Sequence, residues 1–270
     1  VFKIGGLASL KSGYGQSMVS GAALAIEEIN AAGGVNGIKL EIDWQDTEAT
    51  ASVGLTATQK LIFGSKVDAL LGCHASTVIL ATDTLVRSSE LLQIAMGSAT
   101  SVADLKNPWI ARVRESDDLT ADVLANYIVD IAGINEIAIF YMSEQYGVGG
   151  KDNMVEALAT KNIKPTITVA HNPQDKDFSS QLLNIKKSGA KAMAVFSGMS
   201  EIPIMLKQAK QLCPEVEIYM SSVGATKAVI DGAGPAADGT YAVVTYTEDN
   251  PDPKVQKFID KWITKHGEPP

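Results

Sequence analysis

The chain contains few of the residues on which most metal, redox and nucleophilic sites depend. Among its 270 residues are 2 cysteines and 3 histidines. Cys73 and Cys213 lie 140 positions apart and form no CxxC pair, so the sequence carries no zinc or redox signature. A disulfide between them stays open as an alternative. The histidines are scattered singly, and we expect no cofactor and no metal ion.

Long apolar runs and basic runs are also missing. No stretch approaches the roughly 20 apolar residues that a transmembrane helix needs. Lys and Arg number 23 against 31 Asp and Glu, a formal charge of −8 that argues against nucleic acid as a partner. Val1 runs directly into an expected strand and not into a signal peptide. The sequence therefore fits either a cytoplasmic protein or one that has lost its leader.

Short apolar runs alternate with amphipathic stretches along the whole chain. The apolar runs predict strands at 2–7, 38–44, 67–71, 91–95, 137–141, 166–170, 192–196 and 218–220. Helical spacing of apolar residues predicts helices at about 18–29, 77–88, 150–160, 178–187 and 201–211. Regular β-α alternation indicates an α/β fold with parallel sheets covered by helices on both faces.

Two segments share one plan, which favours two sheets. Residues 60–72 and 186–198 each have a basic helix end, a small-residue turn, an apolar strand and a final glycine. Ligands of open α/β sheets bind at the carboxyl ends of strands. Gly72 and Gly198 mark such ends in different halves, so two lobes facing each other would form a cleft. We expect the chain to cross between them near 112–118.

The catalytic motifs that the sequence partly resembles are all incomplete. Gly13-Tyr-Gly15 and Gly147-Val-Gly149 begin a dinucleotide-binding pattern, but its final glycine is missing from both. Gly150-Lys151 resembles the end of a P-loop without the residues on either side that a P-loop needs. GxSxG is absent, and His74 and Ser76 have no evident acidic partner. We therefore predict that the protein is not an enzyme.

Hydroxyl side chains follow two of the predicted strands. Ser76 and Thr77 come just after one strand, and Ser98, Thr100 and Ser101 come after the next. Either group alone could consist of helix N-caps. Together with the free N–H groups of a helix start, they would form a neutral site suited to a carboxylate.

At this point the sequence resembles the type I periplasmic solute-binding proteins of branched-chain amino acid ABC transporters. Residues 22–37, AALAIEEINAAGGVNG, are similar to the family pattern A-x-E-x-I-N-A-x-G-G-x-x-G. Supporting matches follow in family order and comprise Asp46-Thr47, 66–72, Gln145-Tyr-Gly147 and Asp177-Phe-Ser179. The resemblance spans about 2–266.

The resemblance implies two Rossmann-like lobes joined by a hinge that closes on the ligand. Lobe 1 would comprise 1–115, lobe 2 would comprise 116–247, and 248–270 would return to lobe 1. Family members continue further, so the rest of lobe 1 and a third crossover are expected beyond this sequence. Such receptors are usually monomers that deliver a small molecule to a membrane permease. They are periplasmic, or extracellular and lipid-anchored.

Ligand contacts are also implied by the resemblance. Ser76 matches a serine that holds the ligand carboxylate, and Ser98 and Thr100 match a pair that meets the ammonium and the carboxylate. Tyr14 and Tyr146 match an aromatic contact in each lobe. The remaining positions expected to line the site are His74, Ala75, Ala99, Met199 and Val223.

One departure from the family bears on the ligand. Amino-acid binders carry an acid that pairs with the ligand ammonium, and Val223 stands at that position here. Met199 occupies a neighbouring position that is often aromatic or polar, and both residues could equally be core packing. An unpaired ammonium in a closed site would cost several kcal/mol. Asp117, Glu144 and Glu201 are the acids that could substitute.

Three hypotheses follow. The leading one is an extracytoplasmic receptor for a small carboxylate with an apolar or aromatic body. The second is a receptor for an aliphatic, branched-chain amino acid, with Asp117 or Glu201 pairing the ammonium. The third is a cytoplasmic small-molecule sensor of the same fold.

Overall fold

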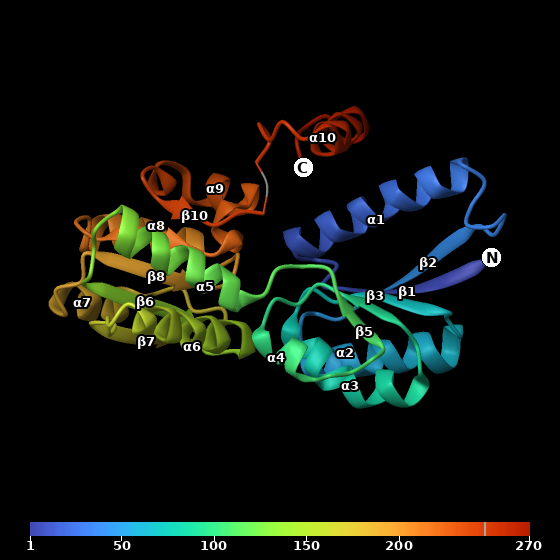
Figure 1. Cartoon of the computed structure of the whole chain (residues 1–270), viewed down its shortest axis with the longest axis horizontal. Helices are drawn as coiled ribbons and strands as arrows, with labels where there is room; N and C mark the ends of the chain where they lie inside the picture. The colour runs from blue at the N-terminus through green and yellow to red at the C-terminus, as the bar shows by residue number, and fades with distance from the viewer. Residues whose placement is uncertain (246) are drawn as a thin grey trace. The chain divides into compact units, whose positions relative to one another are not determined.

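A computed structural model describes residues 1–245 and 247–270, which divide into two compact units (Figure 1). Unit 1 comprises 1–97, 102–114 and the C-terminal segment ending at Pro270; unit 2 comprises 98–101 and 115–245. Each unit is built on one five-stranded sheet in which all neighbouring strands are parallel. The predicted α/β class is confirmed.

Unit 1 alternates strands and helices from its first residues. Its strands are β1 (Phe2–Ala8), β2 (Leu40–Asp46), β3 (Ala69–Gly72), β4 (Gln93–Ala95) and β5 (Ile110–Arg112). Its helices are α1 (Gly13–Ala31), α2 (Ala51–Gln59), α3 (Ser76–Ser89) and α10 (Pro253–His266), with α4 (Thr100–Asp104) shared between the units. Figure 1 shows α1 on one side of this sheet and α2 and α3 on the other.

Unit 2 repeats the arrangement. Its strands are β6 (Ile137–Met142), β7 (Ile167–His171), β8 (Ala192–Phe196), β9 (Glu217–Met220) and β10 (Tyr241–Ala242). Its helices are α5 (Asp117–Asn126), α6 (Gln145–Thr160), α7 (Ser179–Lys187), α8 (Ile202–Leu212) and α9 (Lys227–Ala233). Short helical turns occupy Lys60–Ser65 in unit 1 and Tyr127–Ile131, Ser222–Ala225 and Gly234–Ala237 in unit 2.

The two sheets have the same strand order. In unit 1 it is β2-β1-β3-β4-β5, and in unit 2, read from the other end, it is β7-β6-β8-β9-β10. Numbered within its own unit, each sheet therefore runs 2-1-3-4-5. The two similar segments of the sequence, 60–72 and 186–198, carry the third strand of each sheet, β3 and β8. Their similarity thus reflects equivalent positions in one repeated topology.

Unit 2 buries both faces of its sheet, and alternate residues of each strand enter different cores. Phe140, Val195 and Met220 pack with apolar residues of α7, α8 and α9. Ile139 and Phe196 point the other way and pack with residues of α5 and α6. The uninterrupted apolar runs of β6 and β8 are explained by this burial, since a strand of a covered parallel sheet needs no polar alternation.

Some boundaries differ from the prediction. Helix α6 begins at Gln145, five residues before the expected start, and its first turns contain three glycines. At Gly150 a Cβ atom would lie 2.3 Å from the Phe196 ring, so glycine lets α6 lie directly against the sheet. Glycine lowers helix propensity, but the tertiary contact overrides it here. Helices α2 and α5 and the short elements α4, β5, α9 and β10 were not predicted.

A matched pair of substitutions in α6 tests this packing. Gly150→Ala places a methyl group against the buried Phe196 ring and should lower the free energy of unfolding by about 1–3 kcal/mol. In Gly149→Ala the added Cβ atom meets no other atom within 4 Å. This substitution should raise the free energy of unfolding by up to about 1 kcal/mol, because alanine favours the helix. Urea denaturation followed by circular dichroism measures both. Equal effects of the two substitutions would contradict the close approach of α6.

Candidate functional site

The strand order itself predicts where each unit binds ligands. In a 2-1-3-4-5 sheet the switch point lies between the first and third strands, at their carboxyl ends. In unit 1 this edge consists of the segments that follow β1 and β3, and in unit 2 of those that follow β6 and β8. The expected site residues at these edges are Tyr14, His74, Ala75 and Ser76 in unit 1 and Tyr146 and Met199 in unit 2.

The two tyrosines occupy equivalent positions. Tyr14 is the second residue of α1 and Tyr146 the second residue of α6, and each helix follows the first strand of its sheet. Each tyrosine is followed by a glycine at which a Cβ atom would lie 2.0 Å from a backbone oxygen, that of Ser9 or that of Met142. No other residue fits so close to a backbone carbonyl. The Tyr-Gly pair therefore fixes a tyrosine at the edge of each sheet.

In unit 1 the tyrosine belongs to a polar aromatic cluster. Arg114 donates from Nη1 to the Tyr14 hydroxyl at 2.6 Å, and its Cζ lies 5.5 Å from the centre of the Tyr14 ring. The ring centres of Tyr14 and His74 are 5.2 Å apart. Arg114 was not among the predicted site residues, although it is a basic residue in the expected crossover segment. Its partner lies 100 positions away in sequence.

Of the two neighbouring side chains Arg114 and His74, only Arg114 is charged at neutral pH. Burial, with a further contribution from the Arg114 guanidinium, lowers the pKa of His74 from 6.5 to about 4. His74 is therefore a neutral imidazole at neutral pH. Neither α1 nor α3 has an acidic residue in its first turn, where it would offset the partial positive charge of the helix start.

Ser76 is the first residue of α3 and is 4% exposed. Its hydroxyl lies so close to Gly97 that a Cβ atom there would come within 2.9 Å of it. Ala75 precedes it as the N-cap and contributes no side-chain hydrogen bond to the helix. A hydroxyl at a helix start suits a carboxylate oxygen.

The second hydroxyl segment, 98–101, is grouped with unit 2, whereas the sequence assigned it to lobe 1. Asn153 of α6 donates to the Thr100 hydroxyl at 2.8 Å. The backbone N–H of Asp117 donates to the carbonyl oxygen of Ser98 at 2.9 Å. Ala99 is buried. These bonds to α5 and α6 explain the grouping.

The edge of unit 2 combines an anchored tyrosine with apolar side chains. Tyr146 and Ser221, which follows β9, share a hydrogen bond of 2.5 Å between their hydroxyl oxygens. Met199 follows β8 and Val223 follows β9, and both are partly buried against the unit's core. Part of each of these two side chains is therefore buried in the core, and the rest is accessible at the carboxyl edge of the sheet.

The acids proposed to replace the missing ammonium partner differ in their surroundings. Glu201 is 4% exposed, and its carboxylate accepts from the backbone N–H of Gln174 at 2.7 Å and from the Ser200 hydroxyl at 2.8 Å. Asp117 is also buried, in the first turn of α5. Glu144 is exposed, and its pKa is raised by partial desolvation and by the nearby Glu201 carboxylate.

A buried serine and histidine lie in contact near the same edge. His171 Nδ1 is 2.9 Å from the carbonyl oxygen of Asn172, so this nitrogen carries the proton, and Nε2 accepts from the Ser197 hydroxyl at 2.8 Å. Ser197 is fully buried and His171 is 2% exposed. Because no substrate can reach this pair, it serves to tie the ends of β7 and β8 together.

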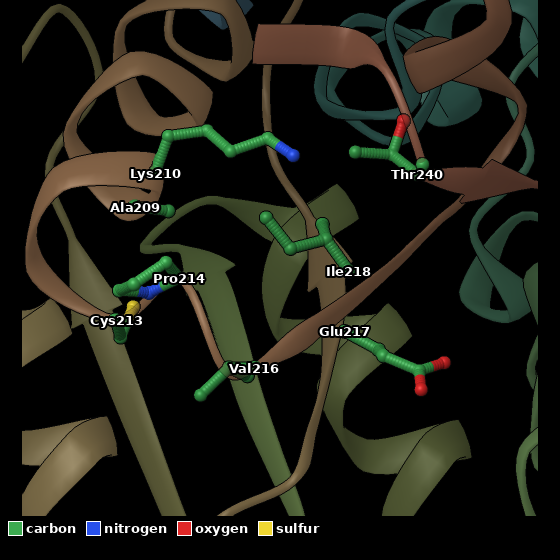
Figure 2. A pocket seen from close by; sticks show the side chains of 9 residues that line it. Ala209, Lys210, Cys213, Pro214, Val216, Glu217, Ile218 and Thr240 are labelled. Atoms are coloured by element: carbon green, nitrogen blue, oxygen red, sulfur yellow. The ribbon is translucent and has the colours of Figure 1, made fainter.

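Two hollows in unit 2 lie away from these edge residues. One, of about 90 Å³, is lined by Lys210, Cys213, Glu217 and their neighbours, around the start of β9 (Figure 2). It is smaller than the roughly 300 Å³ at which ligand pockets begin. The other, of about 300 Å³, lies beside the stacked rings of Tyr219 and Tyr241. Neither contains a predicted site residue.

Cys73 and Cys213 are free and buried in different units. Among the described residues, no group of three or more His, Cys, Asp or Glu side chains could hold a metal ion. Over the same part of the chain, no helix is long and apolar enough to span a membrane.

Comparison with known proteins agrees with this geometry. A model of the family described as periplasmic binding protein matches residues 1–270. The chain belongs to that family. Its members are solute-binding receptors and not enzymes, and their work with ABC importers places them outside the cytoplasm. The expected family, fold and receptor role are confirmed.

The individual relatives have low sequence identity to this chain. The leucine-, isoleucine-, valine-, threonine- and alanine-binding protein of Pseudomonas aeruginosa is 27% identical over 95% of this chain and 68% of its own length. The isoleucine complex of LivJ from Streptococcus pneumoniae has a TM-score of 0.92 at 20% identity, covering 100% of this chain and 78% of that one. A benzoate complex of a solute-binding protein from Rhodopseudomonas palustris has a TM-score of 0.91 at 18% identity, covering 100% of this chain and 75% of that one.

The depressed pKa of His74 predicts a pH effect on this receptor. Unfolding restores the pKa from about 4 to 6.5, so between these values the unfolded chain binds more protons and falling pH destabilises the fold. By pH 4.5 the loss is about 2–3 kcal/mol. Urea denaturation at pH 7.5 and 4.5 should show a smaller loss in His74→Gln than in the wild type. An imidazole that titrates near 6.5 by NMR would contradict the prediction.

Proposed function

We propose that the receptor binds a small organic acid with an apolar or aromatic body and delivers it to an ABC importer. The observation that carries the proposal is the contrast between the two carboxyl edges. That of unit 1 combines a cation with hydroxyl and N–H donors, whereas that of unit 2 presents apolar surface beside a tyrosine. One edge suits a carboxylate and the other a hydrocarbon body.

The polar end of the ligand would contact Ser76 and Thr100. Ser76 of unit 1 offers a hydroxyl at the start of α3, and Thr100, which is grouped with unit 2, offers a second hydroxyl at the start of α4. Ser98, Ala99, His74 and Ala75 lie next to them in sequence and complete the proposed set. The apolar end would contact Tyr14, Tyr146, Met199 and Val223.

A branched-chain amino acid is the second candidate. The P. aeruginosa relative is named for binding leucine, isoleucine and valine, which favours it. Of the acids suggested for the ammonium, Glu201 already accepts two hydrogen bonds from the protein. Glu144, whose pKa is raised by partial desolvation and by the Glu201 carboxylate, would gain most from an ammonium. The organic acid remains the better fit because Val223 stands where an acid is expected.

Partner and location follow from the same proposal. The ligand-loaded receptor would dock as a monomer on a membrane permease. It would act in the periplasm or, held by a lipid anchor, at the outer surface of the cell. The proposal draws on the family's role with ABC importers.

A thermal-shift panel separates the two candidates. Benzoate, 4-hydroxybenzoate and 4-methyl-2-oxopentanoate should raise the melting temperature, because each carries a carboxylate on a planar or apolar body and no ammonium. Leucine, isoleucine and valine should have little effect. Stabilisation by the three amino acids alone would establish the second candidate instead.

Removing either hydroxyl should weaken carboxylate binding. A buried hydrogen bond to a charged group contributes about 1.5–3 kcal/mol, so Ser76→Ala and Thr100→Ala should each raise Kd at least about tenfold. Isothermal titration with the tightest-binding acid of the panel measures this. Thr84→Ala, at an exposed position of α3, is the control and should leave Kd unchanged. Unaltered affinity in both site variants would remove the hydroxyls from the site.

A further inference from the structure

Three separate segments of unit 1 converge at the carboxyl edge of its sheet. Tyr14 follows β1, His74 follows β3 and Arg114 follows β5. The ring centres of Tyr14 and His74 are 5.2 Å apart, and Arg114 donates a hydrogen bond of 2.6 Å to the Tyr14 hydroxyl. A guanidinium held at a ligand-binding edge by a tyrosine is a feature that the family resemblance did not imply.

The contact with Tyr14 fixes the orientation of the guanidinium. The Tyr14 hydroxyl accepts a hydrogen bond from one of its five N–H groups, and Cζ of the guanidinium lies 5.5 Å from the centre of the Tyr14 ring. A side chain restrained in this way loses little conformational entropy when it binds an anion. Arg114 is half-buried, so its charge is less screened by solvent than that of a surface arginine.

We propose that Arg114 is a ligand-binding, specificity-determining residue, whose guanidinium contacts the ligand carboxylate and selects anions over zwitterions. This inference rests on the proposed function and deepens it. The guanidinium attracts a carboxylate and offers it charge-assisted hydrogen bonds. The same charge repels an ammonium on the adjacent carbon of an amino acid. The neutral His74 imidazole and the Tyr14 ring add flat surfaces that suit a planar acid.

The experiment compares acids with their neutral amides. The probes are benzoate, 4-hydroxybenzoate and 4-methyl-2-oxopentanoate, each paired with its primary amide, and Kd is measured by isothermal titration. In the wild type each bound acid should bind at least about tenfold more tightly than its amide. Arg114→Gln should raise Kd for the acid at least about tenfold and change Kd for the amide by less than about twofold.

Further variants separate charge from structure. Arg114→Lys keeps the charge but not the planar fork, and should retain part of the preference for the acid. Tyr14→Phe removes the hydroxyl that orients the guanidinium and should reduce the preference without abolishing it. Arg87→Gln alters an arginine of α3 that is 44% exposed and paired with Asp83, and should change nothing.

Each outcome decides between the two proposals. If the acids bind and Arg114→Gln leaves their Kd unchanged, or weakens acid and amide equally, the role of Arg114 is refuted while the proposed function stands. If none of the three acids binds, the proposed function fails, and the inference that rests on it fails too. If leucine binds the wild type as tightly as 4-methyl-2-oxopentanoate, the selection of anions is refuted.

Discussion

The close approach of a helix to the end of the preceding strand is the constraint on which both candidate edges depend. Gly15 and Gly147 permit it, since a Cβ atom at either position would overlap a backbone carbonyl oxygen. The helix start then brings its N–H groups and a tyrosine to the carboxyl end of the sheet. Because the contact occurs at the same place in a repeated topology, each unit places a tyrosine on the edge that strand order marks for ligands.

Beyond this shared frame the two units differ in chemistry. Around Tyr14 unit 1 gathers a guanidinium and a neutral imidazole. Unit 2 bonds Tyr146 to a buried serine, and the segments after β8 and β9 add the thioether of Met199 and the side chain of Val223. Glu201 and His171 of unit 2 are buried. Their hydrogen bonds tie the segments that follow neighbouring strands together. The same fold can thus present different side chains at the carboxyl edges of its two sheets, because loop side chains are less constrained by core packing than strand side chains.

The sequence predicted the α/β class and most strands, since short uninterrupted apolar runs such as 192–196 are typical of strands in a covered parallel sheet. It placed the start of α6 wrongly because Gly147 and Gly150 are poor helix formers, and their benefit appears only in contacts with Met142 and Phe196. The residues at strand ends were predicted from their positions and from family resemblance. Arg114 was missed because its contact with Tyr14 spans 100 positions, which no local pattern records.

The burial of both thiols makes the receptor convenient to convert into a sensor. Cys73 is fully buried, and burial raises the pKa of its thiol. Burial likewise raises the pKa of Cys213 to about 11, so neither sulfur is a reactive thiolate at neutral pH. A cysteine introduced at an exposed position near either tyrosine would therefore accept a fluorescent maleimide at that position alone. The native cysteines could stay in place, and emission from the dye would report occupancy of the edge beside it.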